Sequence, residues 1–114
     1  MNLADAFDLV VSAIGDADVA VALRPADLAP PCCYVRTYRY ADAAGPLTDG
    51  TAATLAVHYV PPRGLDDQLA DAATLDGLMA ALSPVTADQV KFQDSTVTIG
   101  DVSWPCYRAE AICY

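Results

Sequence analysis

The sequence predicts an α+β domain in which two helices pack on a mostly antiparallel sheet, in the order α-β-β-β-α-β-β-β. Two segments show the apolar spacing of amphipathic helices, and several others alternate apolar and polar residues as half-buried strands do. The 114 residues match the size of one domain, and no internal repeat or linker divides them. We therefore expect a single domain over residues 1–114.

The first expected element is a helix over residues 3–14. Its apolar residues recur at the spacing of one helix face: Leu3, Phe7, Val10 and Ile14. Asn2 is placed to cap its start, and Gly15 can end it. The following segment alternates Val19, Val21 and Leu23 with smaller or charged residues, which predicts a half-buried strand closed by Pro25.

The stretch "PCCYVRTYRY", residues 31–40, predicts a second strand, because tyrosine, threonine and valine favour strands and a proline precedes it. One face would carry Cys33, Val35, Thr37 and Arg39. The other face would carry Tyr34, Arg36, Tyr38 and Tyr40. Tyrosine and arginine are enriched at protein–protein contacts, so we expect the second face to be a subunit or partner interface.

Residues 41–50, "ADAAGPLTDG", predict a flexible loop rich in small and turn-forming residues. A third strand follows in "TAATLAVHYV", residues 51–60, with apolar and aromatic residues on one face and Thr54, Ala56 and His58 on the other. The segment "PPRG" ends this strand.

A second helix is expected from Asp66 to Leu82, with Asp66 and Asp67 at the positive end of its dipole and Ser83-Pro84 at its end. One apolar stripe is suited to packing on the sheet: Leu65, Leu69, Ala72, Leu75, Met79 and Leu82. A second face carries small, uncharged residues and is therefore smooth: Ala70, Ala73, Gly77, Ala80 and Ala81. This second face indicates either another neighbour, such as a second subunit, or simply an alanine-rich composition.

The rest of the chain is predicted to form strands. "QVKF" (89–92) is the first, and "STVTIGDVSW" (95–104) follows with a hairpin turn at Gly100-Asp101. The last strand, "CYRAEAICY" (106–114), is expected to begin after Pro105.

The net charge of −9 argues against reading of DNA or RNA by a basic face, and no Lys/Arg cluster is present to bind anionic lipid. The N-terminus lacks the positive region of a signal peptide, and no apolar run reaches the roughly 20 residues of a membrane span. We therefore expect a protein made in a cytoplasm. Its acidity would suit a surface past which DNA slides without binding.

The four cysteines do not have the spacing of metal or redox sites. Adjacent Cys32 and Cys33 point to opposite faces of a strand, and so do Cys106 and Cys113. A composite site with one cysteine from each strand remains geometrically open. The alternative, which we favour, is that the cysteines are small buried apolar residues.

His58 is the single histidine, so any catalytic nucleophile that is activated by a histidine would have to use it. The simpler interpretation is a solvent-side or interface residue. Asp76 projects close to the leucine stripe, so it should either meet an arginine or lie at the margin of the stripe. No phosphate-binding glycine loop or carboxylate cluster is present, and we expect no catalytic residue, no metal and no cofactor.

The order of elements resembles the tail terminator proteins of long-tailed bacteriophages, of the lambda type. The segments that carry the likeness are "LADAFDLVVSAI", "TAATLAVHYV", "DDQLADAATLDGLMAAL" and "TVTIGDVSWPCYRAEAI". The likeness spans nearly the whole chain and lies in the pattern of elements, the length and the composition.

The resemblance implies a ring, generally hexameric, that caps the tail tube and joins it to the head connector. It implies a virion protein of the neck, assembled in the host cytoplasm, without enzymatic activity or cofactor. Its partners would be copies of itself, the major tail tube protein and the connector or stopper, while genomic DNA would pass through the lumen without specific binding. On this view the subunit or partner interface includes Tyr34, Arg36, Tyr38, Tyr40, Ala73, Gly77 and Ala80. An assembly loop or the lumen would include Asp42, Asp49, Asp67 and Asp71.

Three alternatives remain open. One is another neck component, such as a head-closure or stopper protein. A second is a small cysteine-dependent enzyme that uses Cys32 or Cys33 with His58 and Arg36. A third is a small-ligand-binding α+β module, for which the sequence offers no polar constellation.

Overall fold

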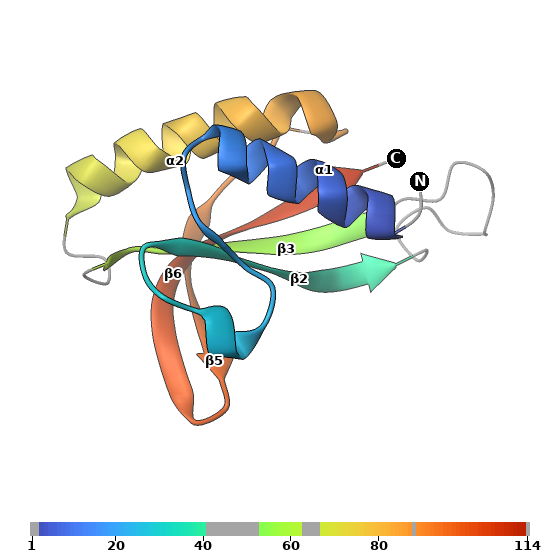
Figure 1. Ribbon diagram of the computed structural model, residues 1–114. Coiled ribbons are helices and arrows are strands. Elements are labelled where there is room, and N and C mark those ends of the chain that lie inside the picture. The colour runs from blue at the N-terminus through green and yellow to red at the C-terminus, as the bar shows by residue number, and fades with distance from the viewer. Residues whose placement is uncertain (1–2, 41–52, 63–66, 88, 114) are drawn as a thin grey trace.

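The computed structural model describes residues 3–40, 53–62, 67–87 and 89–113, with the backbone alone for residues 37–40. Within this part of the chain, two helices lie side by side over one face of a five-stranded sheet (Figure 1). The strand order is β1-β2-β3-β6-β5, in which β1 is parallel to β2 and the other neighbours are antiparallel. The fold is α+β, as predicted, and its sheet is mixed: three of the four described strand pairs are antiparallel and one is parallel.

The described elements have the following bounds: α1 Leu3–Asp16, β1 Val21–Ala22, η1 Pro25–Asp27, β2 Cys32–Tyr40, β3 Ala53–Val60, α2 Gln68–Leu82, η3 Ser83–Val85, β5 Gln93–Ile99 and β6 Val102–Cys113. The predicted helices and the three strands before α2 are all present. The strands after α2 differ from the prediction in number.

Helix α1 buries the predicted stripe. Val10 and Ile14 are fully enclosed, and Leu3 and Phe7 are partly buried against the same core. The helix continues past Gly15 to Asp16, and the turn that follows uses Asp18 in the left-handed region with φ of 60°. Aspartate tolerates this conformation better than most residues do, because its short side chain can bond locally.

Two strand predictions after α2 were wrong. Residues 89–92 form no strand, although Val90 and Phe92 still pack against the core. Pro105 does not divide the last strand, because β6 is continuous from Val102 to Cys113. The β3–β6 pairing reaches only to Tyr107, so Pro105 lies where β6 has β5 as its one described strand neighbour. A proline is tolerated there because a missing N–H disturbs fewer ladder bonds.

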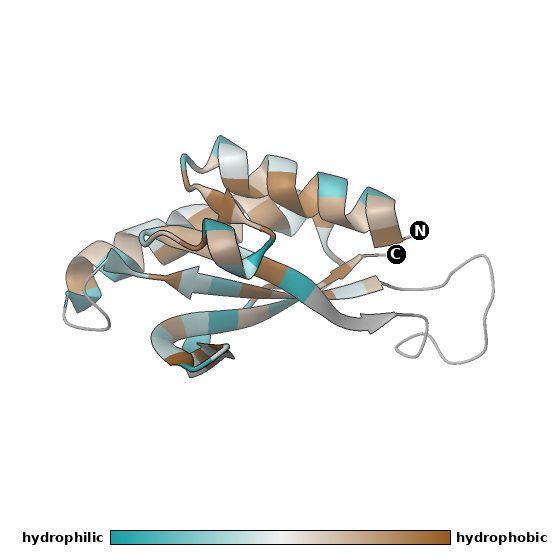
Figure 2. Cartoon of the chain, turned by 60° about the horizontal axis from the view of Figure 1, so that its bottom comes forward, coloured by the Kyte–Doolittle hydropathy of each residue, from teal (hydrophilic) through white to brown (hydrophobic). Residues whose placement is uncertain are grey.

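The hairpin of β5 and β6 curves away from the other strands, on the side opposite the helices (Figures 1 and 2). Its turn is at Gly100-Asp101, as predicted, with Ile99 paired to Val102. The curvature brings Val97, Ile99 and Trp104 into a second apolar cluster, which also contains these residues from the sheet and the adjoining segment: Ala22, Leu28, Cys32, Tyr34, Val60 and Cys106. The sheet therefore has a core on each face.

Helix α2 packs on the sheet with a face that only partly matches the predicted stripe: Leu75 and Leu82 lie on both. Its buried residues are Asp71, Leu78 and Leu82, and Leu75 is partly buried. Leu69, expected in the buried stripe, exposes 87% of its surface. The spacing 71-75-78-82 follows one helix face, whereas Leu69 lies off it. The apolar pattern alone did not fix the rotation of the helix, because leucines lie on both the predicted and the observed stripe. Neither described helix combines the length and the hydropathy that a bilayer crossing needs.

This placement of α2 predicts a contrast between two leucines of the helix. Leu78→Ala should lower the free energy of unfolding by about 2–5 kcal/mol, because it leaves a cavity in a closed core. Leu69→Ala should change it by less than about 0.5 kcal/mol. Urea denaturation of the two variants checks the prediction, and equal losses would contradict the observed helix face.

Candidate functional site

Strand β2 alternates between the two cores, as its sequence predicts. Cys33 and Val35 face the helices, while Cys32 and Tyr34 belong to the cluster under the hairpin. Tyr34 is only 8% exposed, so within the subunit it packs the second core and offers little surface to a partner. Arg36 is exposed on the same strand. The side chains of Thr37, Tyr38, Arg39 and Tyr40 lie outside the described residues.

His58 is buried beneath the hairpin, with 5% of its surface exposed. Its Nδ1 atom lies 3.8 Å from Sγ of Cys106, and its ring centroid lies 6.2 Å from that of Tyr34. Burial, followed by the nearby charges of Arg108 and Arg36, lowers the pKa of His58 to about 4. The imidazole is therefore neutral at pH 7.

All four cysteines are free and buried, and they divide between the two cores. Cys33 and Cys113 face the helices, and Cys32 and Cys106 face the hairpin, which confirms the predicted opposite orientations. Burial raises the pKa of Cys33 to about 12 and that of Cys106 to about 11. At neutral pH the Cys106–His58 contact is thus between a thiol and a neutral imidazole. Cys33 lies across the sheet from His58.

Asp71 is a carboxylate in the helix–sheet interface, with 3% of its surface exposed. The hydroxyl of Tyr107 donates a hydrogen bond to its Oδ2 atom over 3.2 Å. The expectation that Asp71 lies on an assembly loop or in a lumen does not match this burial. Its place on the 71-75-78-82 face explains why: the same helical spacing that buries the leucines carries Asp71 toward the sheet.

The partners around Asp71 are uncharged at neutral pH. Burial is the main cause that raises the pKa values of both Tyr59 and Tyr107 above their ordinary range, so both phenols keep their protons. Among the described residues, the ion pairs are Arg24–Asp27 and Arg108–Glu110, and neither includes Asp71. A buried carboxylate is ordinarily paired with a cation or heavily hydrogen-bonded, so Asp71 is incompletely compensated within this part of the chain.

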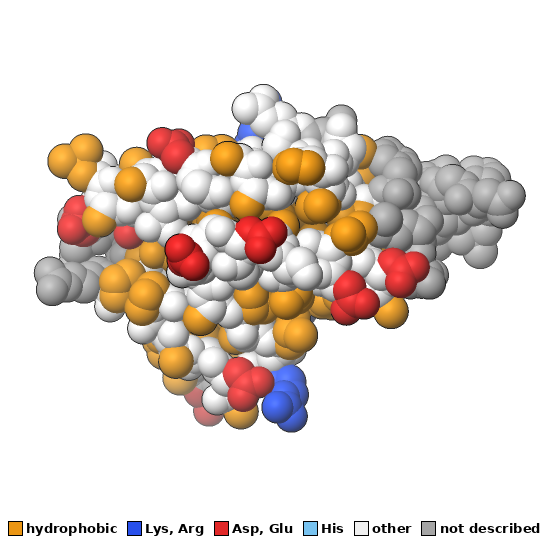
Figure 3. Space-filling view, turned by 45° about the horizontal axis from the view of Figure 1, so that its top comes forward, with side chains coloured by type: hydrophobic (Ala, Val, Ile, Leu, Met, Phe, Trp, Pro, Cys, Tyr) orange, Lys and Arg blue, Asp and Glu red, His pale blue; other side chains and the backbone are white. Residues whose placement is uncertain are grey.

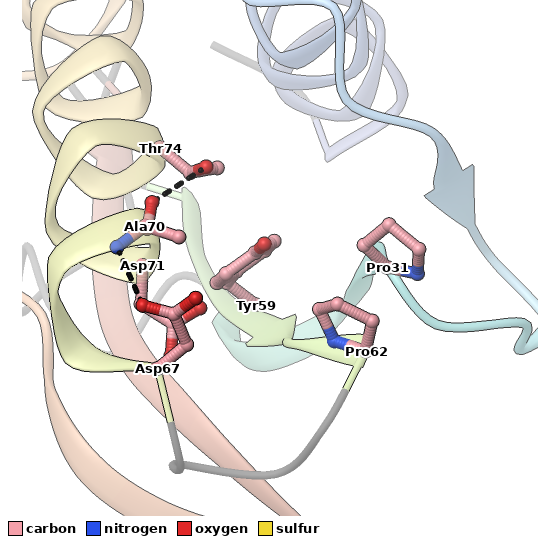
Figure 4. Close-up of a pocket in the computed structure, with 7 residues that line it drawn as sticks. All are labelled: Pro31, Tyr59, Pro62, Asp67, Ala70, Asp71 and Thr74. Atoms are coloured by element: carbon pink, nitrogen blue, oxygen red, sulfur yellow. Dashed lines mark hydrogen bonds between the residues drawn. The ribbon is translucent and has the colours of Figure 1, made fainter.

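A cavity of about 360 Å³ opens beside Asp71. Figure 4 shows Tyr59 of β3 between the two acidic residues of α2, Asp67 and Asp71, and the rings of Pro31 and Pro62. Ala70 and Thr74 complete its wall. A smaller cavity of about 210 Å³ adjoins it and shares Pro31, Tyr59 and Thr74. Asp67 also caps α2, since its Oδ1 atom accepts a hydrogen bond from the Ala70 N–H over 3.1 Å.

The outer face of α2 is a second candidate surface, which we call the outer α2 face. It consists of exposed residues with little charge: Leu69, Ala72, Ala73, Asp76, Gly77 and Ala80. Three residues predicted from the sequence as interface residues lie on it, Ala73, Gly77 and Ala80. Asp76 is exposed, as expected for a margin position. The predicted loop at 41–50, with Asp42 and Asp49, lies outside the described residues.

Comparisons of the chain with protein-family models, with curated proteins and with solved structures found no match. Sequence reasoning missed two features of the site geometry: the contact of His58 with Cys106 and the bond between Asp71 and Tyr107. The helical spacing of Asp71 was a visible signal, whereas the His58–Cys106 contact depends on how the last strand pairs.

The buried His58 predicts acid sensitivity. Its pKa of about 4 in the folded chain is below the ordinary value of 6.5, so the unfolded chain takes up its proton first as the pH falls. The stability that neutral, buried His58 contributes is fully present above pH 6.5. The free energy of unfolding should fall by up to roughly 3 kcal/mol as the pH drops from 6.5 to 4. Urea denaturation across this range should show a smaller loss in His58→Gln; identical slopes for the two proteins would contradict the prediction.

The buried thiols predict slow labelling. At pH 7.5 in the native protein, all four cysteines should react with an aromatic disulfide reagent far more slowly than a free thiol, because they are enclosed and protonated. After denaturation they should react at the free-thiol rate. One unusually fast native cysteine would instead favour the cysteine-dependent enzyme.

Proposed function

We propose that this protein is a structural virion subunit that assembles into a ring, as the tail terminator proteins it resembles do. In this role the ring, hexameric in that family, caps the tail tube and joins it to the head connector, and DNA passes through its lumen. The observation that carries the proposal is the outer α2 face, a helix surface that is apolar and smooth where a solvated helix would be charged.

Leu69 supports this interpretation because its side chain is almost wholly in solvent in the single chain. Figure 3 shows hydrophobic side chains over much of the helical layer, with acidic groups scattered between them. Apolar side chains exposed together on one face mark protein–protein contacts, and a second subunit would remove them from water.

Gly77 adds a second argument. A glycine inside a helix costs about 1 kcal/mol relative to alanine. Nothing in the described part of the subunit lies within 4 Å of where its Cβ would be, so packing inside the chain does not require glycine there. A close approach by a neighbouring subunit would supply the reason that the single chain lacks.

Two further features suit assembly. Strand β5 has one described strand neighbour, β6, so one of its edges presents backbone groups that a partner strand could pair with. The net charge of −9 would keep a lumen wall from holding DNA.

The test is the mass of the purified protein with and without tail-tube subunits, together with negative-stain images of the product. Ring-sized particles are expected, and Leu69→Glu should abolish them while leaving the fold intact, because the residue is 87% exposed. Val102→Glu, which places the same charge at another exposed apolar residue, on the hairpin, is the matched control and should still assemble.

Several outcomes separate the candidates. A monomer that never associates with tubes would contradict the proposal. Binding to connector subunits and not to tubes would indicate a head-closure or stopper protein instead. Equal assembly of wild type and Leu69→Glu would show that the outer α2 face is not the contact.

A further inference from the structure

The cavity beside Asp71 has an electrostatic imbalance that the described residues do not resolve. Asp71 is buried and lines the cavity, yet among the described residues its one hydrogen-bond donor is the neutral hydroxyl of Tyr107. A carboxylate has about four acceptor positions on its two oxygens, so most of its capacity is unused. Asp67 adds a second acidic group at the same wall, and the chain as a whole is strongly acidic. A cation in this cavity would be attracted by both carboxylates.

The walls indicate which cation fits. Tyr59 presents an aromatic ring between the acidic residues and the two prolines, Pro31 and Pro62, as Figure 4 shows. The cavity has flat rings on one side and carboxylates on the other. A planar, delocalised cation suits it, because such a cation can stack on the rings while it donates hydrogen bonds to the carboxylates. A guanidinium group has this form and binds carboxylates through paired N–H donors. The volume of about 360 Å³ lies within the range of small-ligand sites.

We propose that this cavity binds a guanidinium group, which donates to Asp71 and Asp67 and stacks on Tyr59. The group belongs either to a small molecule or to an arginine side chain of a second copy of the chain. Arg24 is one candidate for the second case, because 80% of its side chain is in solvent even in its ion pair with Asp27. The inference concerns binding by the single chain and does not depend on ring formation.

An anion is a poor alternative occupant, although the cavity lies at the beginning of α2. The helix N-terminus favours negative charge, but Asp67 already takes the free N–H of Ala70. The Asp67 and Asp71 carboxylates would repel a phosphate or carboxylate brought to the same wall.

The experiment titrates the full chain with n-butylguanidinium and, separately, with n-butylurea, its neutral isostere, followed by backbone amide NMR shifts. The expected result is saturable binding of the guanidinium, with a dissociation constant on the order of 1 mM and shifts confined to the cavity walls. The urea should bind at least about tenfold more weakly because it lacks the charge. Equal binding of the two, or no saturable binding at millimolar concentrations, would overturn the proposal.

Variants identify the residues involved. Asp71→Asn keeps an oxygen that can accept from Tyr107 and should weaken guanidinium binding about tenfold or more. Asp76→Asn makes the same charge change on the exposed side of the same helix and should leave binding unchanged. Ala70→Leu adds bulk at the cavity wall without touching a carboxylate and should also block binding. Wild-type affinity in both Asp71→Asn and Ala70→Leu would overturn the assignment.

A further measurement distinguishes the sources of the group. If a second copy supplies the arginine, saturating n-butylguanidinium should dissociate assembled protein into smaller species in sedimentation equilibrium, and Arg24→Gln should weaken assembly if Arg24 is the residue. If the natural ligand is a small molecule, the mass should not change. Should n-butylguanidinium bind Arg63→Gln but not wild type, the chain's own arginine would occupy the cavity and the proposal would be wrong.

Discussion

Strand β3 is buried on both faces along its whole length, from Ala53 to Val60, and this requirement shapes the rest of the molecule. A sheet face that packs apolar residues must be covered, and a central strand that is buried on both faces needs two covers. The two helices supply one. The other is formed by the curved β5–β6 hairpin and the segment around η1, which enclose Cys32, Tyr34 and Val60. Because both faces of β3 are buried, the sheet has a core on each side.

Covering both faces also encloses polar groups. His58 lies under the hairpin in its neutral form, and Asp71 lies under α2, where the hydroxyl of Tyr107 donates to it. The surroundings of His58 and of Asp71 act differently on the charged form of each side chain. Burial, followed by the neighbouring arginines, disfavours a charged His58, so its contact with Cys106 joins two neutral groups. Asp71 instead borders an open cavity, where a bound cation could supply the compensating charge that the described side chains do not.

The proposed assembly and the proposed cation site concern different surfaces of α2. The outer α2 face turns away from the sheet, whereas the cavity lies at the seam between the first turns of the helix and the end of β3. One surface would act by removing apolar area from water, and the other by neutralising a buried charge. If an arginine of a second copy entered the cavity, the two proposals would be linked. Helix α2 would then present both its outer face and the acidic cavity to neighbouring copies.

The sequence by itself determined the fold class, the first helix, the first three strands, the alternation along β2 and the turn at Gly100-Asp101, because each depends on local spacing or backbone preference. It also placed the cysteines on opposite faces. Only the tertiary structure decided which face of α2 is buried, since leucines lie on both the predicted and the observed stripe and packing on the sheet selects between them. It likewise kept Pro105 within β6, brought Cys106 to His58 and brought Tyr107 to Asp71. Those contacts join residues far apart in the chain, and strand pairing, which local sequence does not encode, sets their distances.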